Sequence, residues 1–362
     1  MRVLAVIGTR PEAVKMLPLI KELKKHNEIE TLVCFSGQHE NLADNVFELF
    51  KIVPDYRFSG LNKNRTLKKM TVAFLDFFDT IFKKTLPDLV LVHGDTTTAF
   101  CASLSAFYLG IKVAHIEAGL RTFNRFSPFP EEFNRIAIDS MSYLHFAPTA
   151  IAKNNLAKEG INSVFITGNT GIDALNYTLT DTYSHPFLKE SKDKKLILIT
   201  THRRENLGEK MASALLGIRD AIKNRNEVFA ILPLHPNPQI KSTANHIFEN
   251  INNIKICSPL SLFDFHNLLS RSYLVISDSG GVQEEAAFLG IPLFLLRDST
   301  ERNECIHDGN AKIIGTDRKH VTKEILLALD DNSYLQQMRK KSLAFGNGCA
   351  SEKIVKNLLS LL

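Results

Sequence analysis

Short apolar runs rich in β-branched residues recur along the chain, and a polar turn and a helix-length segment follow each run. Clear examples are Arg2–Ile7, Leu89–Val92 and Val113–Ile116. Unbroken runs of this kind are typical of strands that helices cover on both faces, as in a parallel sheet. Ligands of an open parallel sheet bind beyond the carboxyl ends of its strands. The pattern therefore predicts an α/β fold with functional residues just after the apolar runs.

This alternation of strand and helix occurs twice, on either side of a polar stretch. A chain of 362 residues has room for two domains, each with its own core. We expect a first Rossmann-like domain over residues 1–176, a charged linker over 177–195 and a second Rossmann-like domain over 196–350. The Phe-rich segment Thr66–Lys84 has helical spacing, which favours a core face or a subunit contact.

Composition excludes several classes of protein. The net charge of +5 and the charged fraction of 23% are ordinary for a globular protein, and no arginine-rich arm or dense basic helix indicates nucleic-acid binding. No window approaches the roughly 18 consecutive apolar residues of a membrane span. The five cysteines lie far apart and form no Cys-x-x-Cys pair, so neither a zinc site nor a disulfide framework is indicated. We expect a cytoplasmic protein.

Acidic residues follow two of the predicted strands. Asp95 and Glu117 come after the strands at 89–92 and 113–116, and Glu131 follows after a proline-marked turn. Several acids converging on one crevice favour proton transfer over packing. A metal site is not indicated, because no cluster of Cys and His completes a ligand set. The histidines at 93 and 115 stay open between a structural and a functional role.

The turn after the first strand has features of an anion site. A helix begins near Thr9 or Arg10, and its free N–H groups favour negative charge. Arg10 and Lys15 add cations beside it. The turn is neither Gly-x-Gly-x-x-Gly nor a P-loop, so neither dinucleotide nor ATP binding is predicted. An ordinary turn with a surface arginine remains the alternative.

The second domain contains a strand-to-helix turn of the same kind. Ser279, Gly280 and Gly281 occupy it, and glycines allow phosphate oxygens to approach the backbone closely. Glu285 lies one helical turn further on, where a carboxylate accepts hydrogen bonds from ribose hydroxyls in doubly wound folds. Phe265 is a candidate for stacking on a base. A plain turn and a core phenylalanine remain the alternatives.

These segments belong to a longer set of motifs. The chain contains, in order and over nearly its whole length, GTRPE, HGDT, HIEAGLRT, PEExNR, TGNT, THRREN, HxNP, SDSGGVQEEA and STER. With so many motifs in register, it closely resembles the bacterial non-hydrolysing UDP-N-acetylglucosamine 2-epimerases. The resemblance implies a glycosyltransferase-B-type fold with the active site in the interdomain cleft, and a homodimer. It also implies that the final helix, 351–362, packs back on the first domain.

The resemblance further implies roles for individual residues. The family's catalytic positions correspond to Asp95, Glu117, Glu131 and His202. Its positions for UDP and the substrate correspond to Arg10, Lys15, Phe265, Ser279, Gly280, Gly281, Glu285 and Arg302. In some relatives a second substrate molecule activates the enzyme at an allosteric site, to which the positions of Gln38, His39 and Arg203 correspond. No metal and no NAD is implied.

The implied reaction interconverts UDP-N-acetylglucosamine and UDP-N-acetylmannosamine for cell-surface polysaccharide precursors. The C2 proton is not next to a carbonyl, so elimination of UDP to 2-acetamidoglucal and re-addition is the expected route, with an acid and a base on opposite faces. Departures from the family pattern, such as Leu260 in place of Gln and Asn303 in place of Pro, leave alternatives open. These are a related UDP-sugar substrate, a hydrolysing 2-epimerase, a glycosyltransferase of similar fold and a binding module.

Overall fold

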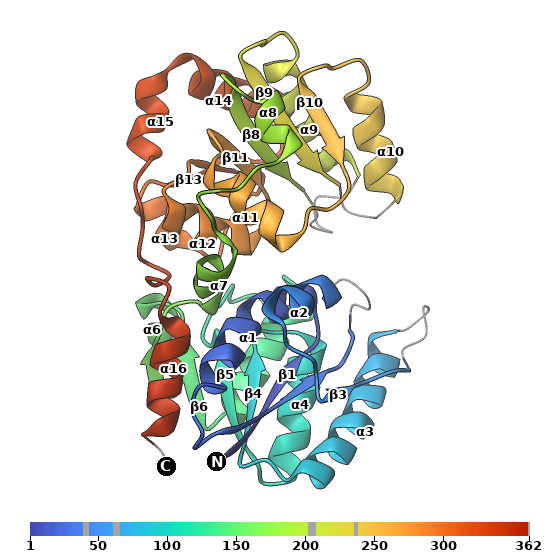
Figure 1. Ribbon diagram of the computed structural model, residues 1–362, viewed down its shortest axis with the longest axis vertical. Coiled ribbons are helices and arrows are strands. Elements are labelled where there is room, and N and C mark those ends of the chain that lie inside the picture. The colour runs from blue at the N-terminus through green and yellow to red at the C-terminus, as the bar shows by residue number, and fades with distance from the viewer. Residues whose placement is uncertain (39–42, 61–65, 202–207, 235–237, 361–362) are drawn as a thin grey trace. The chain divides into compact units, whose positions relative to one another are not determined.

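The computed structural model describes most of the chain, namely residues 1–38, 43–60, 66–201, 208–234 and 238–360. His39, His202 and Arg203 lie outside the described residues. The chain divides into two compact units (Figure 1). Met1–Tyr177 and Phe345–Leu362 form the first unit, and Thr178–Ala344 forms the second. Among the described helices, none combines the length and apolar character that a membrane span needs.

The first unit is built on a seven-stranded parallel sheet with the order β3-β2-β1-β4-β5-β6-β7. Its strands are β1 (Arg2–Ile7), β2 (Glu30–Phe35), β3 (Tyr56–Arg57), β4 (Leu89–His93), β5 (Lys112–Ile116), β6 (Leu144–Ala147) and β7 (Val164–Ile166). Its helices are α1 (Arg10–Leu23), α2 (Asp44–Phe50), α3 (Leu67–Thr85), α4 (Thr97–Tyr108), α5 (Glu131–Met141), α6 (Ala150–Lys158), α7 (Thr170–Thr178) and α16 (Ala350–Leu359).

The core of this unit explains why the strand sequences are unbroken apolar runs. Leu4 and Val6 of β1 contribute to a buried cluster with Phe74, Phe78 and Phe82 of α3. Val3, Ala5 and Ile7, which alternate with them along β1, are equally buried. Both faces of the sheet are therefore covered, as expected of a parallel sheet. The aromatic face of α3 packs within the unit's own core.

The second unit is built on a six-stranded parallel sheet with the order β10-β9-β8-β11-β12-β13. Its strands are β8 (Lys195–Thr200), β9 (Val228–Pro233), β10 (Ile254–Cys257), β11 (Leu274–Ser277), β12 (Leu293–Leu295) and β13 (Ala311–Ile313). Its helices are α8 (Pro186–Glu190), α9 (Glu209–Ile222), α10 (Pro238–Ile247), α11 (Leu262–Ser270), α12 (Gly280–Leu289), α13 (Asn303–His307), α14 (Arg318–Asp330) and α15 (Asn332–Met338).

Two helices of the first unit begin directly after a threonine whose side chain caps the first turn. Thr9 is the N-cap of α1, and its hydroxyl accepts a hydrogen bond from Glu12 N. Thr96 caps α4 by accepting from Ala99 N at 3.0 Å. Of the two caps that the sequence left open for the first helix, the structure has Thr9 and begins the helix at Arg10. Polar groups at the carboxyl ends of β1 and β4 are thereby held in place.

The C-terminal helix α16 belongs to the first unit and packs against α1 (Figure 1). The carboxylate of Asp173 accepts hydrogen bonds from the first backbone N–H groups of α16, on Ala350 at 3.0 Å and Ser351 at 2.6 Å. These N–H groups have no partner within the helix, so a buried carboxylate satisfies them. The end of the chain is therefore fastened to α7.

Candidate active site

Asp95 and Glu117 lie at the carboxyl ends of the neighbouring strands β4 and β5. Glu117 is buried and has a φ of +63°, a left-handed conformation that residues other than glycine rarely adopt. Such a conformation persists only where the surroundings hold the residue, and it clusters at functional sites. Gly94, with a φ of +67°, turns the chain between β4 and Asp95. The sheet thus brings two acids to one edge.

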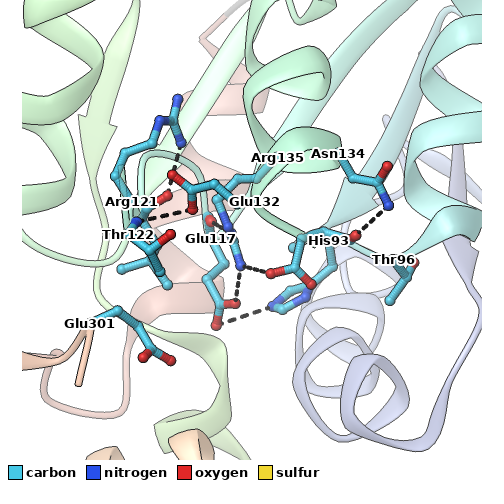
Figure 2. Close-up of polar contacts among 12 residues, drawn as sticks. His93, Thr96, Glu117, Arg121, Thr122, Glu132, Asn134, Arg135 and Glu301 are labelled. Atoms are coloured by element: carbon cyan, nitrogen blue, oxygen red, sulfur yellow. Dashed lines mark hydrogen bonds and ion pairs between the residues drawn. The ribbon is translucent and has the colours of Figure 1, made fainter. Parts of the chain in front are cut away.

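Arg135 of helix α5 joins the two acids, and Figure 2 shows its guanidinium beside Glu117. Its guanidinium donates short hydrogen bonds to the Asp95 carboxylate and to the carbonyl oxygen of Glu117, and its Nη2 lies 3.4 Å from Oε1 of Glu117. Burial alone would lower the pKa of Arg135, but the charges of Asp95 and Glu117 outweigh it and raise the pKa. A shared cation allows two like charges to remain close together.

The other carboxylate oxygen of Glu117, Oε2, has its own donors. Lys15 of α1 contacts it, and Asn169 Nδ2 donates to it at 2.7 Å. The Nε2 atom of His93 lies 3.8 Å away (Figure 2). Burial lowers the pKa of His93 to about 3, so its ring is neutral near pH 7. Side chains from three separate segments therefore surround one carboxylate.

His115 of β5 supports this edge of the sheet from behind. Its ring nitrogens lie 2.6 Å from Oδ1 of Asp139 and 2.7 Å from the carbonyl oxygen of Gly94. Arg121 donates to the other oxygen of Asp139 at 2.7 Å. Burial acts to raise the pKa of Asp139, but His115 and Arg121 outweigh it and bring the pKa to about 2. His115 therefore has a structural role, because it holds the turn that carries Asp95.

Glu12 ties the turn after β1 to the turn after β4. Its carboxylate accepts from Gly8 N at 3.1 Å, from the Thr9 hydroxyl at 2.8 Å and from the Thr96 hydroxyl at 2.8 Å. Burial raises the pKa of Glu12 to about 7 even though these hydrogen bonds act to lower it. Arg10 is the first residue of α1, directly after Thr9, and is half-buried.

Gln38 joins a third strand end to the same network. Its Oε1 accepts from Thr98 N at 3.1 Å and from the Thr98 hydroxyl at 2.9 Å, and Thr98 lies in the first turn of α4. A Cβ atom on Gly8 would lie 2.2 Å from Oγ1 of Thr98, so only glycine fits there. The carboxyl ends of β1, β2 and β4 are thus packed together.

Glu131 and Glu132 begin helix α5 but differ in their surroundings. The carboxylate of Glu132 is buried and accepts from Thr122 N at 3.0 Å and Phe123 N at 2.9 Å, which fixes the preceding loop (Figure 2). Glu131 is half-buried and lies four residues before Arg135. Residues four apart share one face of a helix. Glu131 is therefore on the side of α5 that carries Arg135.

In the second unit, Arg302 lies beside the N-terminus of α12. Ser279 is the N-cap, and it makes no side-chain capping hydrogen bond to the described helix. A Cβ atom on Gly280 would lie 2.8 Å from Nη1 of Arg302, so the guanidinium lies directly against the glycine backbone. Arg302 is buried and pairs with Glu284 and Glu301. Helix N–H groups beside a guanidinium suit a phosphate.

Glu285 lies on α12 itself, and Phe265 lies on the neighbouring helix α11. Glu285 is in the second turn of α12, and its Oε1 lies 3.8 Å from the position of a Cβ atom on Gly281. Phe265 lies on α11 and is half-buried, with its ring centroid 6.1 Å from that of His266. The second unit thus carries a helix N-terminus, a cation, a carboxylate and an aromatic ring, all suited to a nucleotide.

Arg135, Asn169 and Glu12 have no assigned role in the sequence-based prediction, yet each contacts the site. The place of Arg135 beside the site could have been predicted, because a helix beginning at Glu131 carries residues 131 and 135 on one face. Asn169 and Glu12 lie within the TGNT and GTRPE motifs, but no periodicity indicates which carboxylate or hydroxyl they contact. Among the described residues, no group of three His, Cys, Asp or Glu side chains is arranged to hold a metal ion.

Two units with parallel sheets, each with polar residues beyond its strand ends, define a two-domain α/β protein of the glycosyltransferase-B type. The spinosyn rhamnosyltransferase SpnG shares this fold, with a TM-score of 0.64 at 15% identity over 99% of this chain and 100% of that chain. The model of the family described as UDP-N-acetylglucosamine 2-epimerase matches residues 21–359, and the chain belongs to this family.

Relatives within the family are similar over their whole length. The UDP-N-acetylglucosamine 2-epimerase of Bacillus subtilis is 45% identical over 361 residues, which cover 99% of this chain and 95% of that protein. The crystal structure of UDP-GlcNAc 2-epimerase from Neisseria meningitidis bound to UDP-GlcNAc has a TM-score of 0.94 at 41% identity. It covers 99% of this chain, which spans 100% of that one.

Proposed function

We propose that this protein is a non-hydrolysing UDP-N-acetylglucosamine 2-epimerase that reversibly inverts C2 to give UDP-N-acetylmannosamine. The observation that carries the proposal is the Arg135 guanidinium contacting both Asp95 and Glu117 at adjacent strand ends. A pure binding protein has little use for two acids held together by a buried cation. Relatives named for this activity, one of them with UDP-GlcNAc bound, support the assignment of the substrate.

The proposed reaction is an elimination followed by an addition. The C1–O bond breaks, UDP leaves with the electron pair, and a base removes the C2 proton, which gives 2-acetamidoglucal and UDP. An acid then protonates C2 on the opposite face while a UDP oxygen attacks C1. Neither step changes the oxidation state of the sugar overall, so no NAD is required. The first unit supplies the acids, and cations stabilise the departing diphosphate.

We assign the proton transfers to Asp95, Glu117 and Glu131, with His202 supporting the leaving group. Asp95 has 29% of its side chain exposed, whereas Glu117 has 6%, so Asp95 is the more accessible acid. A cation, Lys15, and an amide donor, Asn169, contact the Glu117 carboxylate. We assign the third acid to Glu131 because its carboxylate is half-buried and lies on the face of α5 that carries Arg135.

We assign UDP binding to the N-terminal end of α12. Ser279, Gly280, Gly281 and Arg302 would hold the diphosphate, Glu285 the ribose and Phe265 the base. Arg10 and Lys15 of the first unit would contribute cations. The contact of Arg302 with the Gly280 backbone supports this assignment. By the family resemblance, Gln38 with His39 and Arg203 would form an allosteric site for a second substrate molecule.

We further propose a cytoplasmic homodimer that serves cell-surface polysaccharide precursors. The five cysteines are unpaired, which is usual in a reducing compartment. Phe107 and Tyr108, 57% and 74% exposed at the end of α4, offer an apolar surface for a second subunit. Sedimentation velocity tests the dimer, and a monomer at micromolar concentration contradicts it.

The test is NMR of chelator-treated protein with UDP-N-acetylglucosamine in deuterated water. We expect UDP-N-acetylmannosamine to appear, with deuterium at C2 of both sugars, because the proton exchanges with solvent in each direction. Free N-acetylmannosamine and UDP would instead assign the protein to hydrolysing epimerases. No turnover with the substrate still bound would favour a transferase or a binding protein, and no binding would indicate a different sugar nucleotide.

A further inference from the structure

His266 of α11 faces the carboxylate of Glu285 on α12. The two side chains are 0% and 12% exposed, and His266 Nε2 lies 3.5 Å from Oε1 of Glu285. This separation exceeds the usual 2.7–3.2 Å of an N–H···O hydrogen bond. Within the described residues, His266 Nε2 and Glu285 Oε2 are both buried without a hydrogen-bond partner. Two buried polar atoms without partners reduce the stability of the fold unless a ligand forms hydrogen bonds with them.

The opposite side of the His266 ring is fixed by the segment that begins the second unit. His266 Nδ1 lies 2.7 Å from the hydroxyl of Thr178. The neighbouring Asn267 donates to the carbonyl oxygen of Thr178 at 2.7 Å and accepts from Thr180 N at 3.2 Å. Three contacts from one short segment therefore determine where the ring nitrogen Nε2 points.

The partners also determine which ring nitrogen carries the hydrogen. An ionised carboxylate only accepts, so the nitrogen that faces Glu285 must be the N–H group if the two are to bond. Nδ1 is then the acceptor in a neutral ring, and the Thr178 hydroxyl donates to it. A hydroxyl on one side of a histidine thus makes the other side a donor, as neighbouring groups do for histidines that bind metals.

We propose that His266 is a positioning residue that orients Glu285 toward the vicinal hydroxyls of the ligand's ribose. This inference rests on the proposed function, in which Glu285 binds the ribose. In the liganded state, the Nε2–H group of His266 donates to Oε1, which lies close to the Gly281 backbone, and a ribose hydroxyl donates to the unfilled Oε2. When the hydroxyls bind, both buried atoms gain the partners that they lack.

The test compares two nucleotides by calorimetry on the full chain. UDP carries both ribose hydroxyls, and 2′,3′-dideoxyuridine diphosphate carries neither. We expect wild-type protein to prefer UDP by about tenfold or more, the range for hydrogen bonds to a charged group. His266→Phe keeps an aromatic ring but removes both nitrogens, so most of this preference should disappear while affinity for the dideoxy nucleotide stays the same. His266→Gln, which can place an N–H group near Glu285, should restore part of it.

A purely structural role for His266 predicts that His266→Phe weakens both nucleotides equally, and this result would overturn the inference. Thr178→Val and Thr178→Ser give a second, milder pair, should the His266 variants fail to fold. The valine removes the donor to Nδ1 and should reduce the UDP preference, whereas the serine keeps it; an unchanged preference in Thr178→Val also overturns the inference. Wild-type protein that binds both nucleotides equally contradicts the role of Glu285, and one that does not bind UDP contradicts the proposed function.

Discussion

Gly168 and Gly346 cross so closely that a Cβ atom on Gly168 would lie 2.8 Å from the Cα atom of Gly346. Both have positive φ, at +90° and +107°. The crossing lets Asn169 N donate to the carbonyl oxygen of Phe345 at 2.7 Å, while the Asn169 side chain donates to Glu117. The segment that returns to the first unit therefore supports a donor of the candidate active site.

The first prediction concerns Gly346→Ala. The methyl group would lie 3.0 Å from the Gly168 Cα atom, and the φ of +107° is unfavourable for alanine. We expect the free energy of unfolding to fall by about 1–3 kcal/mol and kcat to fall because Asn169 is displaced. Gly309→Ala is a matched control, since Gly309 also has a positive φ of +80° but nothing within 4 Å of a Cβ atom. Equal losses in both variants, measured by denaturant unfolding, would show that the crossing does not matter.

The second prediction concerns the cation that Asp95 and Glu117 share. Arg135→Gln removes it and leaves two like charges close together without their shared cation, so kcat should fall by about 10²-fold or more. Arg135→Lys keeps the charge but not the fork of donors, so its kcat should fall less. Steady-state kinetics measure both variants, and an unchanged kcat in Arg135→Gln would separate Arg135 from the chemistry.

The positions of Asp95 and Glu117 were predictable because a parallel sheet brings successive strand ends to one edge, whatever the loops do. The contact of these two acids with Arg135 was not predictable, because it depends on how α5 approaches that edge. The edge strands β3 and β13 were also missed, since two- and three-residue strands carry no readable alternation. In the second unit, the turn at Ser279–Gly281 was predictable from its glycines, but the orientation of His266 depends on Thr178, 88 residues away.

The third prediction is a pH dependence of stability that arises from Glu12. Burial raises the pKa of Glu12 from 4.5 to about 7, so the folded state binds this proton more tightly than the unfolded state does. Its contribution is fully present below pH 4.5 and is lost as the pH rises through 7. Glu12→Gln has no proton to lose at this position. Its free energy of unfolding, compared with that of wild type, should therefore rise by at most about 3 kcal/mol between pH 4.5 and 8. Denaturant unfolding at several pH values measures the gap, and a gap that does not change with pH contradicts the prediction.

The last prediction compares two adjacent glycines at the start of α12. Gly281→Ala places a methyl group at an ordinary 3.8 Å from Glu285, so helix propensity should stabilise the fold by about 0.5–1 kcal/mol. Gly280→Ala places one 2.8 Å from Arg302, whose guanidinium is held by Glu284 and must move.

Because the displaced guanidinium no longer lies at the helix N-terminus, Gly280→Ala should weaken UDP binding by about tenfold, the value of one hydrogen bond to a charged group. An Arg302→Ala background supplies the decisive control. There the Gly280→Ala change has no guanidinium to displace, so calorimetry should find little further loss of UDP affinity. If Gly280→Ala weakens UDP equally in both backgrounds, the methyl group blocks the phosphate directly, and Arg302 is not the reason that glycine occupies position 280.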